Sequence, residues 1–438
     1  MTAPGRSTRP RAAIDRGRAV GSVGSTPRMG NGYTPPVEGS GERMVSRRRL
    51  LSGFAAAGAA GFAGCLGNGP GATSFSPGRD STTEWPLPGR GPRATNYAPD
   101  AVAPRTPPTE RWRAEVGRAV GRVVVAGDTV FVPAEDALHA LRLRDGEERW
   151  RAPIRPYGVA VADGVAYAVS RDEPLVYAFE AGTGEERWRA EAAADFAAAP
   201  LPVSAGDAVV VGDTDGRVAA LAPRTGEPRW AFRTFTGVYS LAARGDRVYV
   251  GTTGGEAYEL HVVEGDDGSP RGVPLWRRKL PGTVRALTAA REAVYAATFG
   301  GGVLRLAIGA AAGRTEWHAA GAPTVTDALV HAGGLLAGAG PTGVSAFGDG
   351  DGGRRWRVGV DRVAPVSPAV AAGDTLYVGI GGALRAYALG GGIGVGPYRV
   401  DIERWRRELS VRNVVVADGA LVVASDDLAG SPGVVVLE

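Results

Sequence analysis

The sequence predicts an all-β fold, an eight-bladed β-propeller of four-stranded antiparallel blades. Tryptophan recurs at intervals of 38, 38, 42, 46, 41, 39 and 49 residues, at Trp112, Trp150, Trp188, Trp230, Trp276, Trp317, Trp356 and Trp405. Short valine-rich runs fill each interval, and a period of about 40 residues with four short strands is typical of a propeller blade. No stretch after residue 70 shows the 3.6-residue periodicity that a solenoid of helix pairs requires.

A glycine stands four residues before the tryptophan in six of the eight units. These glycines are Gly146, Gly184, Gly226, Gly272, Gly313 and Gly352. A glycine at a fixed offset indicates a turn position that requires a positive φ. We therefore expect each of them to lie in a tight turn that leads into the strand bearing the tryptophan.

The apolar runs upstream of each glycine predict further strands joined by hairpins. Residues 208–212 and 217–221, for example, are separated by Asp-Thr-Asp-Gly, a hairpin signal. Each unit is therefore predicted to hold an inner strand, a second strand, a third strand that ends at the glycine turn, and an outer strand with the tryptophan.

The last unit is one strand short. It offers residues 411–417, 420–425 and 433–437, and the sequence ends at Glu438. An additional strand, Glu110 to Val116, precedes the first complete unit and contains Trp112. We expect this N-terminal strand, residues 110–116, to complete the last blade, because such a closure removes two exposed sheet edges.

The Thr-Gly-x-x-x-Trp element, at Thr183 to Trp188 and Thr225 to Trp230, resembles the repeat of the pyrroloquinoline-quinone (PQQ) propeller superfamily. The opening Trp-Pro-Leu-Pro-Gly at residues 85–89, followed by Thr-Asn-Tyr at 95–97, is similar to the start of many secreted members. The resemblance covers about Trp85 to Glu438. It implies that all eight tryptophans dock between neighbouring blades. One superfold hosts many functions, so the resemblance bears on fold more than on activity.

The segment before the propeller has the pattern of an export signal. Around Arg47 and Arg48 the sequence Ser-Arg-Arg-x-Leu-Leu resembles the twin-arginine (Tat) pattern. Residues 62–65, Phe-Ala-Gly-Cys, resemble a lipobox in which phenylalanine replaces the usual leucine. Cys65, the one cysteine of the chain, is then the expected lipidation site; the alternative is an incidental or buried thiol. The style of the signal resembles haloarchaeal lipoproteins.

These patterns divide the chain into four parts. Residues 1–43 are predicted to be disordered or a mis-assigned extension ahead of a true start at Met44. Residues 44–65 are the signal, 66–84 a flexible Gly/Ser/Thr/Pro tether, and 85–438 the propeller domain. The expected location is outside the cell, anchored by lipid to the outer face of the cytoplasmic membrane. The expected partner is another exported or membrane protein, and we expect a monomer.

The charge distribution gives no reason to expect a nucleic-acid partner. The whole chain is formally +4, but residues 1–64 contain 10 arginines and three acidic residues. The rest has 40 basic and 43 acidic residues, a formal charge of −3. The basic balance therefore belongs to the leader, and a basic binding surface is not predicted for the propeller.

Candidate site residues are few. The resemblance to quinoprotein dehydrogenases implies PQQ in a central funnel, a Ca²⁺ held by carboxylate and amide oxygens, and an aspartate base. No glutamate, asparagine and aspartate set matches that pattern. Residues that precede or begin inner strands are candidates for the funnel, with solvated loop positions as the alternative: Asp195, Asp327, Asp361 and Asn413.

Other chemistry is not predicted. The four histidines, at 139, 261, 318 and 331, fall in four different units without ligand spacing, so no metal site is expected. The Asp-Gly clusters at 213–216, 266–268 and 349–352 suggest calcium loops, but they read better as hairpin turns. The glycine runs 300–302 and 390–392 are expected to be turns rather than phosphate-binding loops.

Two functions remain. The first is a non-catalytic, lipid-anchored scaffold without a cofactor that binds a protein or other ligand, similar to the BamB assembly lipoproteins. The alternative is a PQQ-dependent dehydrogenase, with Ca²⁺, that oxidises alcohols or sugars. The lack of recognisable catalytic residues favours the scaffold.

Overall fold

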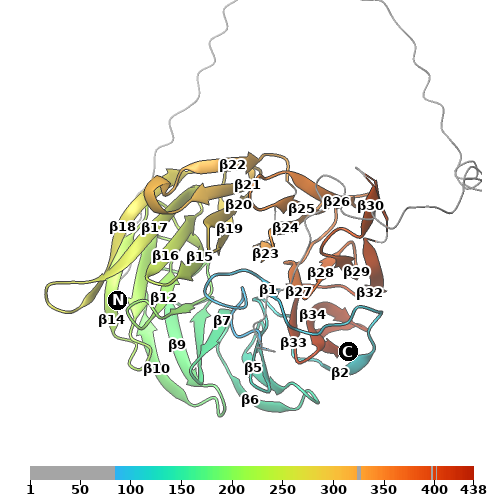
Figure 1. The fold of residues 1–438 in the computed structure, drawn as a ribbon. Helices are drawn as coiled ribbons and strands as arrows, with labels where there is room; N and C mark the ends of the chain where they lie inside the picture. The colour runs from blue at the N-terminus through green and yellow to red at the C-terminus, as the bar shows by residue number, and fades with distance from the viewer. Residues whose placement is uncertain (1–83, 323–326, 396–397, 401) are drawn as a thin grey trace, which may run out of the picture. The chain divides into compact units, whose positions relative to one another are not determined.

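The computed structural model describes residues 84–322, 327–395, 398–400 and 402–438. The predicted signal with Arg47, Arg48 and Cys65, the extension 1–43 and the tether up to residue 83 lie outside the described residues. Eight sheets form a ring around a central axis (Figure 1). In the described chain, regular helix is limited to the short 3-10 turn η2 (Gly309–Ala311). The predicted all-β, eight-bladed propeller is confirmed, and no described helix is long and apolar enough to cross a membrane.

Blades are numbered along the chain, and each has an inner, second, third and outer strand. Blade 1 contains β3 (Val124–Ala126), β4 (Thr129–Pro133), β5 (Leu138–Arg142) and β6 (Glu148–Ala152). Blade 2 contains β7 (Pro156–Ala162), β8 (Val165–Ser170), β9 (Leu175–Glu180) and β10 (Glu186–Glu191). Blade 3 contains β11 (Leu201–Val203), β12 (Ala208–Gly212), β13 (Arg217–Leu221) and β14 (Pro228–Arg233). Blade 4 contains β15 (Val238–Arg244), β16 (Arg247–Thr252), β17 (Glu256–Glu264) and β18 (Pro270–Lys279).

The second half of the ring follows the same order. Blade 5 contains β19 (Val284–Ala289), β20 (Ala293–Thr298), β21 (Gly302–Ala307) and β22 (Thr315–Ala319). Blade 6 contains β23 (Val330–Ala332), β24 (Leu335–Gly340), β25 (Gly343–Gly348) and β26 (Arg354–Gly359). Blade 7 contains β27 (Val370–Ala372), β28 (Thr375–Ile380), β29 (Ala383–Ala388) and β32 (Glu403–Glu408). Blade 8 contains β33 (Asn413–Ala417), β34 (Ala420–Leu428), β35 (Ser431–Leu437) and β2 (Glu110–Ala114).

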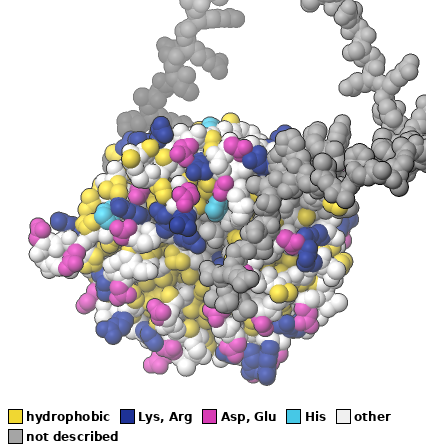
Figure 2. Space-filling view, in the orientation of Figure 1, with side chains coloured by type: hydrophobic (Ala, Val, Ile, Leu, Met, Phe, Trp, Pro, Cys, Tyr) yellow, Lys and Arg dark blue, Asp and Glu magenta, His cyan; other side chains and the backbone are white. Residues whose placement is uncertain are grey.

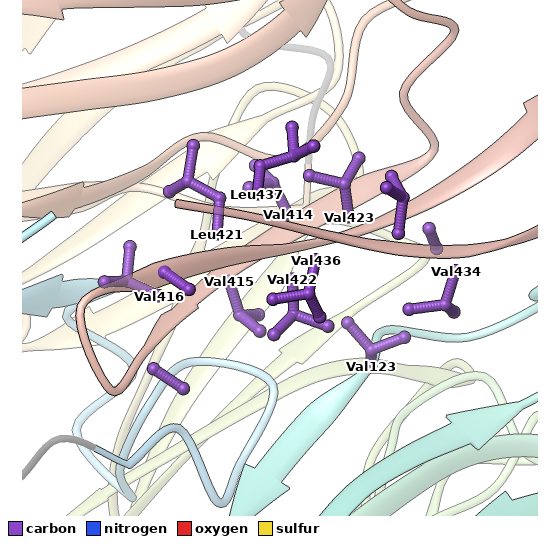
Figure 3. Packing of buried hydrophobic residues seen from close by; sticks show 14 of the residues in the cluster. Val123, Val414, Val415, Val416, Leu421, Val422, Val423, Val434, Val436 and Leu437 are labelled. Carbon is purple, nitrogen blue, oxygen red and sulfur yellow. The ribbon is translucent and has the colours of Figure 1, made fainter. Parts of the chain in front are cut away.

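Blade 8 is built from both ends of the described chain. Strand β2 pairs antiparallel with β35, with Trp112 opposite Val436. The backbone amides and carbonyls of Thr109 and Glu438 extend this pairing at 2.7 and 2.9 Å. The blade is packed with valines, and Figure 3 shows Val123 of the segment leading into blade 1 beside this cluster. One sheet therefore joins the N-terminal and C-terminal strands through a shared hydrophobic core.

All eight tryptophans of the ladder lie on the outer strands, and their rings contact the following blade. A Cβ atom added at Gly184 would lie 2.6 Å from the Trp150 ring, and one added at Gly226 would lie 2.6 Å from Trp188. The same contact joins Gly146 to Trp112, Gly272 to Trp230, Gly313 to Trp276 and Gly352 to Trp317. Glycine is therefore needed at this position, because the tryptophan ring of the neighbouring blade occupies the space that a side chain would need.

One of the predicted turn glycines is not in a turn. Gly146, Gly184, Gly226, Gly313 and Gly352 have φ between 67° and 77°, whereas Gly272 lies inside β18. The hairpin of β17 and β18 is longer than its counterparts, so its turn is displaced to Gly265–Ser269, where Gly268 has a φ of 75°. The prediction of a turn at Gly272 was wrong, and the extra hairpin length accounts for the 46-residue interval.

Blade 7 has two additions. Strand β1 (Tyr97–Ala98) pairs parallel with the inner strand β27 as a fifth strand. A small two-stranded sheet, β30 (Ile393–Val395) and β31 (Tyr398–Val400), is inserted between the third and outer strands. This insertion explains the longest tryptophan interval, 49 residues between Trp356 and Trp405.

Candidate functional site

The inner strands of the blades surround a central funnel with a volume of about 290 Å³. Every blade contributes to its wall at or just before the start of its inner strand. Taken from blades 1 to 8, these residues include Arg122, Tyr157, Ala198, Tyr239, Arg285, Asp327, Pro368 and Asn413. Side chains from distant parts of the sequence therefore converge on one space.

A segment before the first blade closes one end of this funnel. Residues 85–98 run past the inner strands of six blades and lie across the middle of the ring in Figure 1. Their backbone carbonyls accept hydrogen bonds from the amides of Val125, Val161, Ala243, Ala289, His331, Ala371 and Gly373. We call residues 85–98 the floor segment, because residues within 87–96 line the funnel.

Asn96 fixes the floor segment to the wall. It is 2% exposed and has a φ of 50°, a conformation that asparagine tolerates better than most residues. Its Nδ2 donates to the carbonyl of Leu329 at 3.0 Å, and its Oδ1 accepts from Nη2 of Arg122 at 2.9 Å. One buried amide therefore joins the floor to blade 6 and to the entrance of blade 1.

Three arginines and one aspartate line the funnel. Arg412 pairs with Asp426, which is not a lining residue, so Arg285, Asp327 and Arg122 provide the remaining charge. Nε of Arg285 donates to Oδ1 of Asp327 at 2.8 Å, and the guanidinium of Arg285 lies 4.7 Å from the centre of the Tyr239 ring. The hydroxyl of Tyr239 donates to the same Asp327 oxygen at 3.4 Å. The third charge, on Arg122, lies deeper, beside Asn96.

The protein around these groups shifts their pKa values. Loss of hydration raises the pKa of Asp327, against the influence of Arg285 and Arg122. Burial likewise raises the pKa of Tyr239 and of Tyr157. Burial lowers the pKa of Arg122 to about 10, with Asp327 opposing the shift, so Arg122 remains charged at neutral pH. Perturbed groups that meet in a cavity are a common property of binding sites.

Only some of the candidate residues predicted from the sequence line the funnel. Asp327 lines the funnel with 46% of its side chain exposed, whereas Asp195 and Asp361, also exposed, are not among the lining residues. Asn413 reaches the funnel edge, but its side chain is 2% exposed and bridges blades 8 and 1, accepting from the amide of Val123 and donating to the carbonyl of Gly121. Asn413 therefore has a role in joining the two blades.

The remaining polar candidates are engaged elsewhere. The histidines at 139, 261 and 331 pair with Glu148, Asp246 and Asp349, and His318 contacts the carbonyl of Gly301. In the Asp-Gly turns the carboxylates of Asp213, Asp267 and Asp351 accept hydrogen bonds from nearby backbone amides. Within the described parts of the chain, no cluster of three or more histidine, cysteine or acidic side chains could hold a metal.

Residues 101–234 match the family model of BamB, the outer membrane protein assembly factor. The match spans less than half of the chain, and no curated protein matches the sequence. The fold is similar to BamB from Moraxella catarrhalis, with 19% identity, a TM-score of 0.61, and coverage of 76% of this chain and 97% of that one.

The BamB-like propeller also shares its fold with enzymes. Quinohemoprotein alcohol dehydrogenase ADHIIG from Pseudomonas putida HK5 is 14% identical, with a TM-score of 0.62 and coverage of 81% of this chain and 80% of that one. A europium-containing methanol dehydrogenase is 12% identical, with a TM-score of 0.63 and coverage of 80% and 90%. At these identities the similarity shows the fold alone.

The funnel of this BamB-like propeller does not fit the calcium-dependent quinone centre that the resemblance implies. Ca²⁺ takes about six to eight oxygen ligands, with carboxylates prominent among them. Asp327 is the one carboxylate among the lining residues, and it is already bound by Arg285. A cation placed there would meet two guanidinium groups, so these residues do not form a calcium site.

The turns between second and third strands, unlike the other loops of the rim, divide into a charged half and an uncharged half. The turns between second and third strands carry Glu135 and Asp136 in blade 1, residues 171–173 (Arg-Asp-Glu) in blade 2, and Asp213 and Asp215 in blade 3. Blade 8 carries Asp426 and Asp427 at the end of β34. The corresponding turns of blades 4 to 7 contain only uncharged residues, at 253–255, 299–301, 341–342 and 381–382.

Large apolar side chains are exposed in the uncharged half. Phe235 is 74% exposed, Phe299 56% and Val363 78%. The loops of Phe235 and Phe299 are joined through the 253–255 turn: Thr236 Oγ1 accepts from the amide of Gly254, Thr283 donates to the carbonyl of Thr253, and the amide of Phe299 donates to the carbonyl of Thr283. The loop of Val363 instead contacts the 341–342 turn, where the amide of Ala364 donates to the carbonyl of Pro341. We call the four turns of blades 4 to 7, with Phe235, Phe299 and Val363, the uncharged patch.

The other surface features are mixed in sign. Figure 2 shows acidic and basic side chains interspersed with hydrophobic ones over the face that it presents.

Proposed function

We propose that this protein is a non-catalytic, lipid-anchored scaffold outside the cytoplasm that binds another exported or membrane protein through the uncharged patch. The observation that carries the proposal is the exposure of Phe235 and Phe299 on loops whose own residues, 234–237 and 299–301, carry no charge. Val363 is exposed on the same rim, directly after the charged pair Asp361 and Arg362. Exposed apolar groups that gather on one surface, with charged residues depleted, are typical of protein-binding sites.

Two further observations support the proposal. The described lining residues of the funnel include one carboxylate, Asp327, where a calcium-dependent quinone centre needs several, and this weighs against the dehydrogenase. The family model and one structural relative are named for BamB, an assembly factor. The lipid anchor is proposed from the sequence around Cys65.

Site-specific photocrosslinking tests the binding surface. A photoreactive amino acid at position 299 should give a discrete crosslinked product in membranes of the source cell. The matched control is the same amino acid at position 102, because Val102 is 80% exposed but lies beside the turn between β33 and β34, away from the patch. Equal products from both positions, or none from 299, would contradict the proposal.

The anchor and the alternative function have separate tests. Cys65→Ser should move the protein from the membrane fraction to the soluble fraction; a variant that stays with the membrane would contradict lipidation at Cys65.

Reconstitution with PQQ and Ca²⁺ should give no bound-cofactor absorbance and no dye-linked oxidation of alcohols or sugars. Turnover in that assay would establish the dehydrogenase instead.

A further inference from the structure

We propose that the funnel is a binding site for a single carboxylate group, held between Arg122 and Arg285. This site is separate from the uncharged patch and does not depend on the scaffold function. The carboxylate comes either from a small organic acid or from the C-terminus of a peptide, since both present the same singly charged, planar group.

The first argument is the state of Arg122. Its guanidinium lines the funnel, and its one hydrogen bond to the described residues goes to the neutral Asn96. Its Nε is buried and has no hydrogen-bond partner among the described residues, and Arg122 forms no ion pair with them. A buried charge without an ionic partner is costly, and a bound anion removes that cost.

The second argument is the charge balance of the funnel. Arg412 also lines the funnel, but its Nε and Nη2 donate to the carboxylate of Asp426 at 2.8 and 3.0 Å. Arg285 uses Nε for Asp327. The two positive charges of Arg122 and Arg285 exceed the single negative charge of Asp327 by one. One monoanion neutralises this excess, whereas a phosphate dianion would leave the funnel with a net negative charge.

The third argument is shape. A guanidinium presents its nitrogens in a plane that matches the two oxygens of a carboxylate. Apolar groups, among them Leu87, Leu201, Leu241 and Leu287, line the rest of the funnel. A volume of about 290 Å³ lies at the small end of the range for ligand sites, so the anion should carry a short apolar body.

The test measures binding to the full chain by calorimetry and thermal melting at pH 8, where inorganic phosphate is mainly the dianion and Arg122, with its pKa lowered to about 10, is still charged. The probes are hexanoate, benzoate, inorganic phosphate, and the tripeptide Ala-Ala-Leu with a free or an amidated C-terminus. We expect at least one carboxylate probe to bind and to raise the melting temperature, while phosphate and the amidated peptide do neither. Stronger binding of the acids would identify a small molecule as the source, and stronger binding of the free tripeptide would identify a peptide terminus.

Three variants locate the site. Arg122→Gln keeps a donor for Asn96 and should weaken carboxylate binding by about tenfold or more, the effect of one charge-assisted hydrogen bond. Asp327→Asn removes the like charge and should strengthen binding. Arg291→Gln, whose side chain is 89% exposed in the turn between β19 and β20, is the control and should bind as the wild type does.

Arg122→Gln should weaken carboxylate binding and Asp327→Asn should strengthen it, so the proposal can be tested even if one of the two variants folds poorly. Without ligand, Arg122→Gln should melt no lower than the wild type, because it removes an uncompensated buried charge. The proposal is overturned if no carboxylate binds, if phosphate binds more tightly than the carboxylates, or if Asp327→Asn weakens binding.

Discussion

Gly184 shows how single residues set the distance between blades. Its φ of 74° is strained for residues with a side chain, and an added Cβ would lie 2.6 Å from the Trp150 ring. Gly184→Ala should destabilise the protein by about 2–4 kcal/mol, from left-handed strain of about 1–2 kcal/mol plus overpacking. The free energy of unfolding in urea measures this.

A matched control lies in the same turn. No heavy atom is within 4 Å of a Cβ added at Gly182, and its φ is not in the left-handed region. Gly182→Ala should therefore change the free energy of unfolding by no more than about 0.5 kcal/mol. If Gly182→Ala and Gly184→Ala lowered the free energy of unfolding equally, the contact with Trp150 would not be what excludes a side chain at residue 184.

The tryptophans themselves contribute packing and a hydrogen bond. Trp188 is 8% exposed, lies 6.0 Å from the Tyr167 ring between centroids, and donates from Nε1 to the carbonyl of Pro223 at 2.9 Å. Trp188→Ala should cost about 3–5 kcal/mol of stability, as a buried aromatic truncation. Trp188→Phe keeps much of the ring packing and should cost less. Unchanged stability with lost ligand binding would instead assign Trp188 to a site.

At the scale of elements, the turn between β25 and β26 connects two blades through Asp349. Its carboxylate accepts from Nε2 of His331 at 3.1 Å, and its carbonyl accepts from Trp317 and Tyr295 of blade 5. The hydrogen bond from His331 is the main cause that lowers the pKa of Asp349, while burial acts in the opposite direction. The turn therefore includes a carboxylate that is stabilised in its ionised form.

This pKa shift predicts a pH dependence of stability. A carboxyl group whose pKa is lowered by folding stabilises the fold above its ordinary pKa, and this contribution is lost as the pH falls through the lowered value. Asp349→Asn should therefore be less stable than the wild type at pH 7, with the difference shrinking as the pH falls below the ordinary aspartate pKa of about 3.9. Urea unfolding at several pH values measures this. Glu292→Gln, 76% exposed in another turn, is the control; a constant gap for Asp349→Asn would contradict the assignment.

Elements that depend on local pattern could be predicted from the sequence. The hairpins of blade 3 and the outer strands follow from alternating apolar runs, turn residues and the tryptophan spacing. Strand β1 and the floor segment could not, because the backbone of residues 85–98 pairs with inner strands that are far away in sequence. Gly272 was misassigned because the same Gly-x-x-x-Trp spacing occurs within a longer hairpin.

The candidate site was predicted only in part. Asp327 was predicted because a carboxylate shortly before an inner strand is a candidate for the funnel. The sequence analysis did not predict Arg122, Arg285, Tyr157 and Tyr239. The sequence signal was weak: Arg122, Tyr157, Tyr239 and Arg285 follow the preceding ladder tryptophan by 10, 7, 9 and 9 residues, so the tryptophan spacing does not align them. Their convergence requires the ring, which no single unit reveals.

At the scale of the whole molecule, the ring depends on a sheet that both ends of the propeller share. Blade 8 takes three strands from the C-terminal part and β2 from the N-terminal part, and the cluster around them includes Trp112, Val422 and Val436. Asn413 adds a second connection, from the first residue of β33 to the backbone on either side of Arg122. The position of Arg122 in the funnel is thus coupled to closure of the ring.

This coupling predicts the effect of opening the ring. Removal of the residues after about Asp418 eliminates β34 and β35, leaves β2 without a partner, and exposes the apolar faces of blades 1 and 7. The truncated chain should lose its single sharp melting transition, because cooperative unfolding requires the blades to support one another around a closed ring. Calorimetry and tryptophan fluorescence measure this. Shortening the tip of the β17–β18 hairpin within residues 265–269 leaves the ring intact and should preserve one transition. A truncated chain that still melts in one sharp step would show that the blades are stable as an open array and that β2 is not needed to close them.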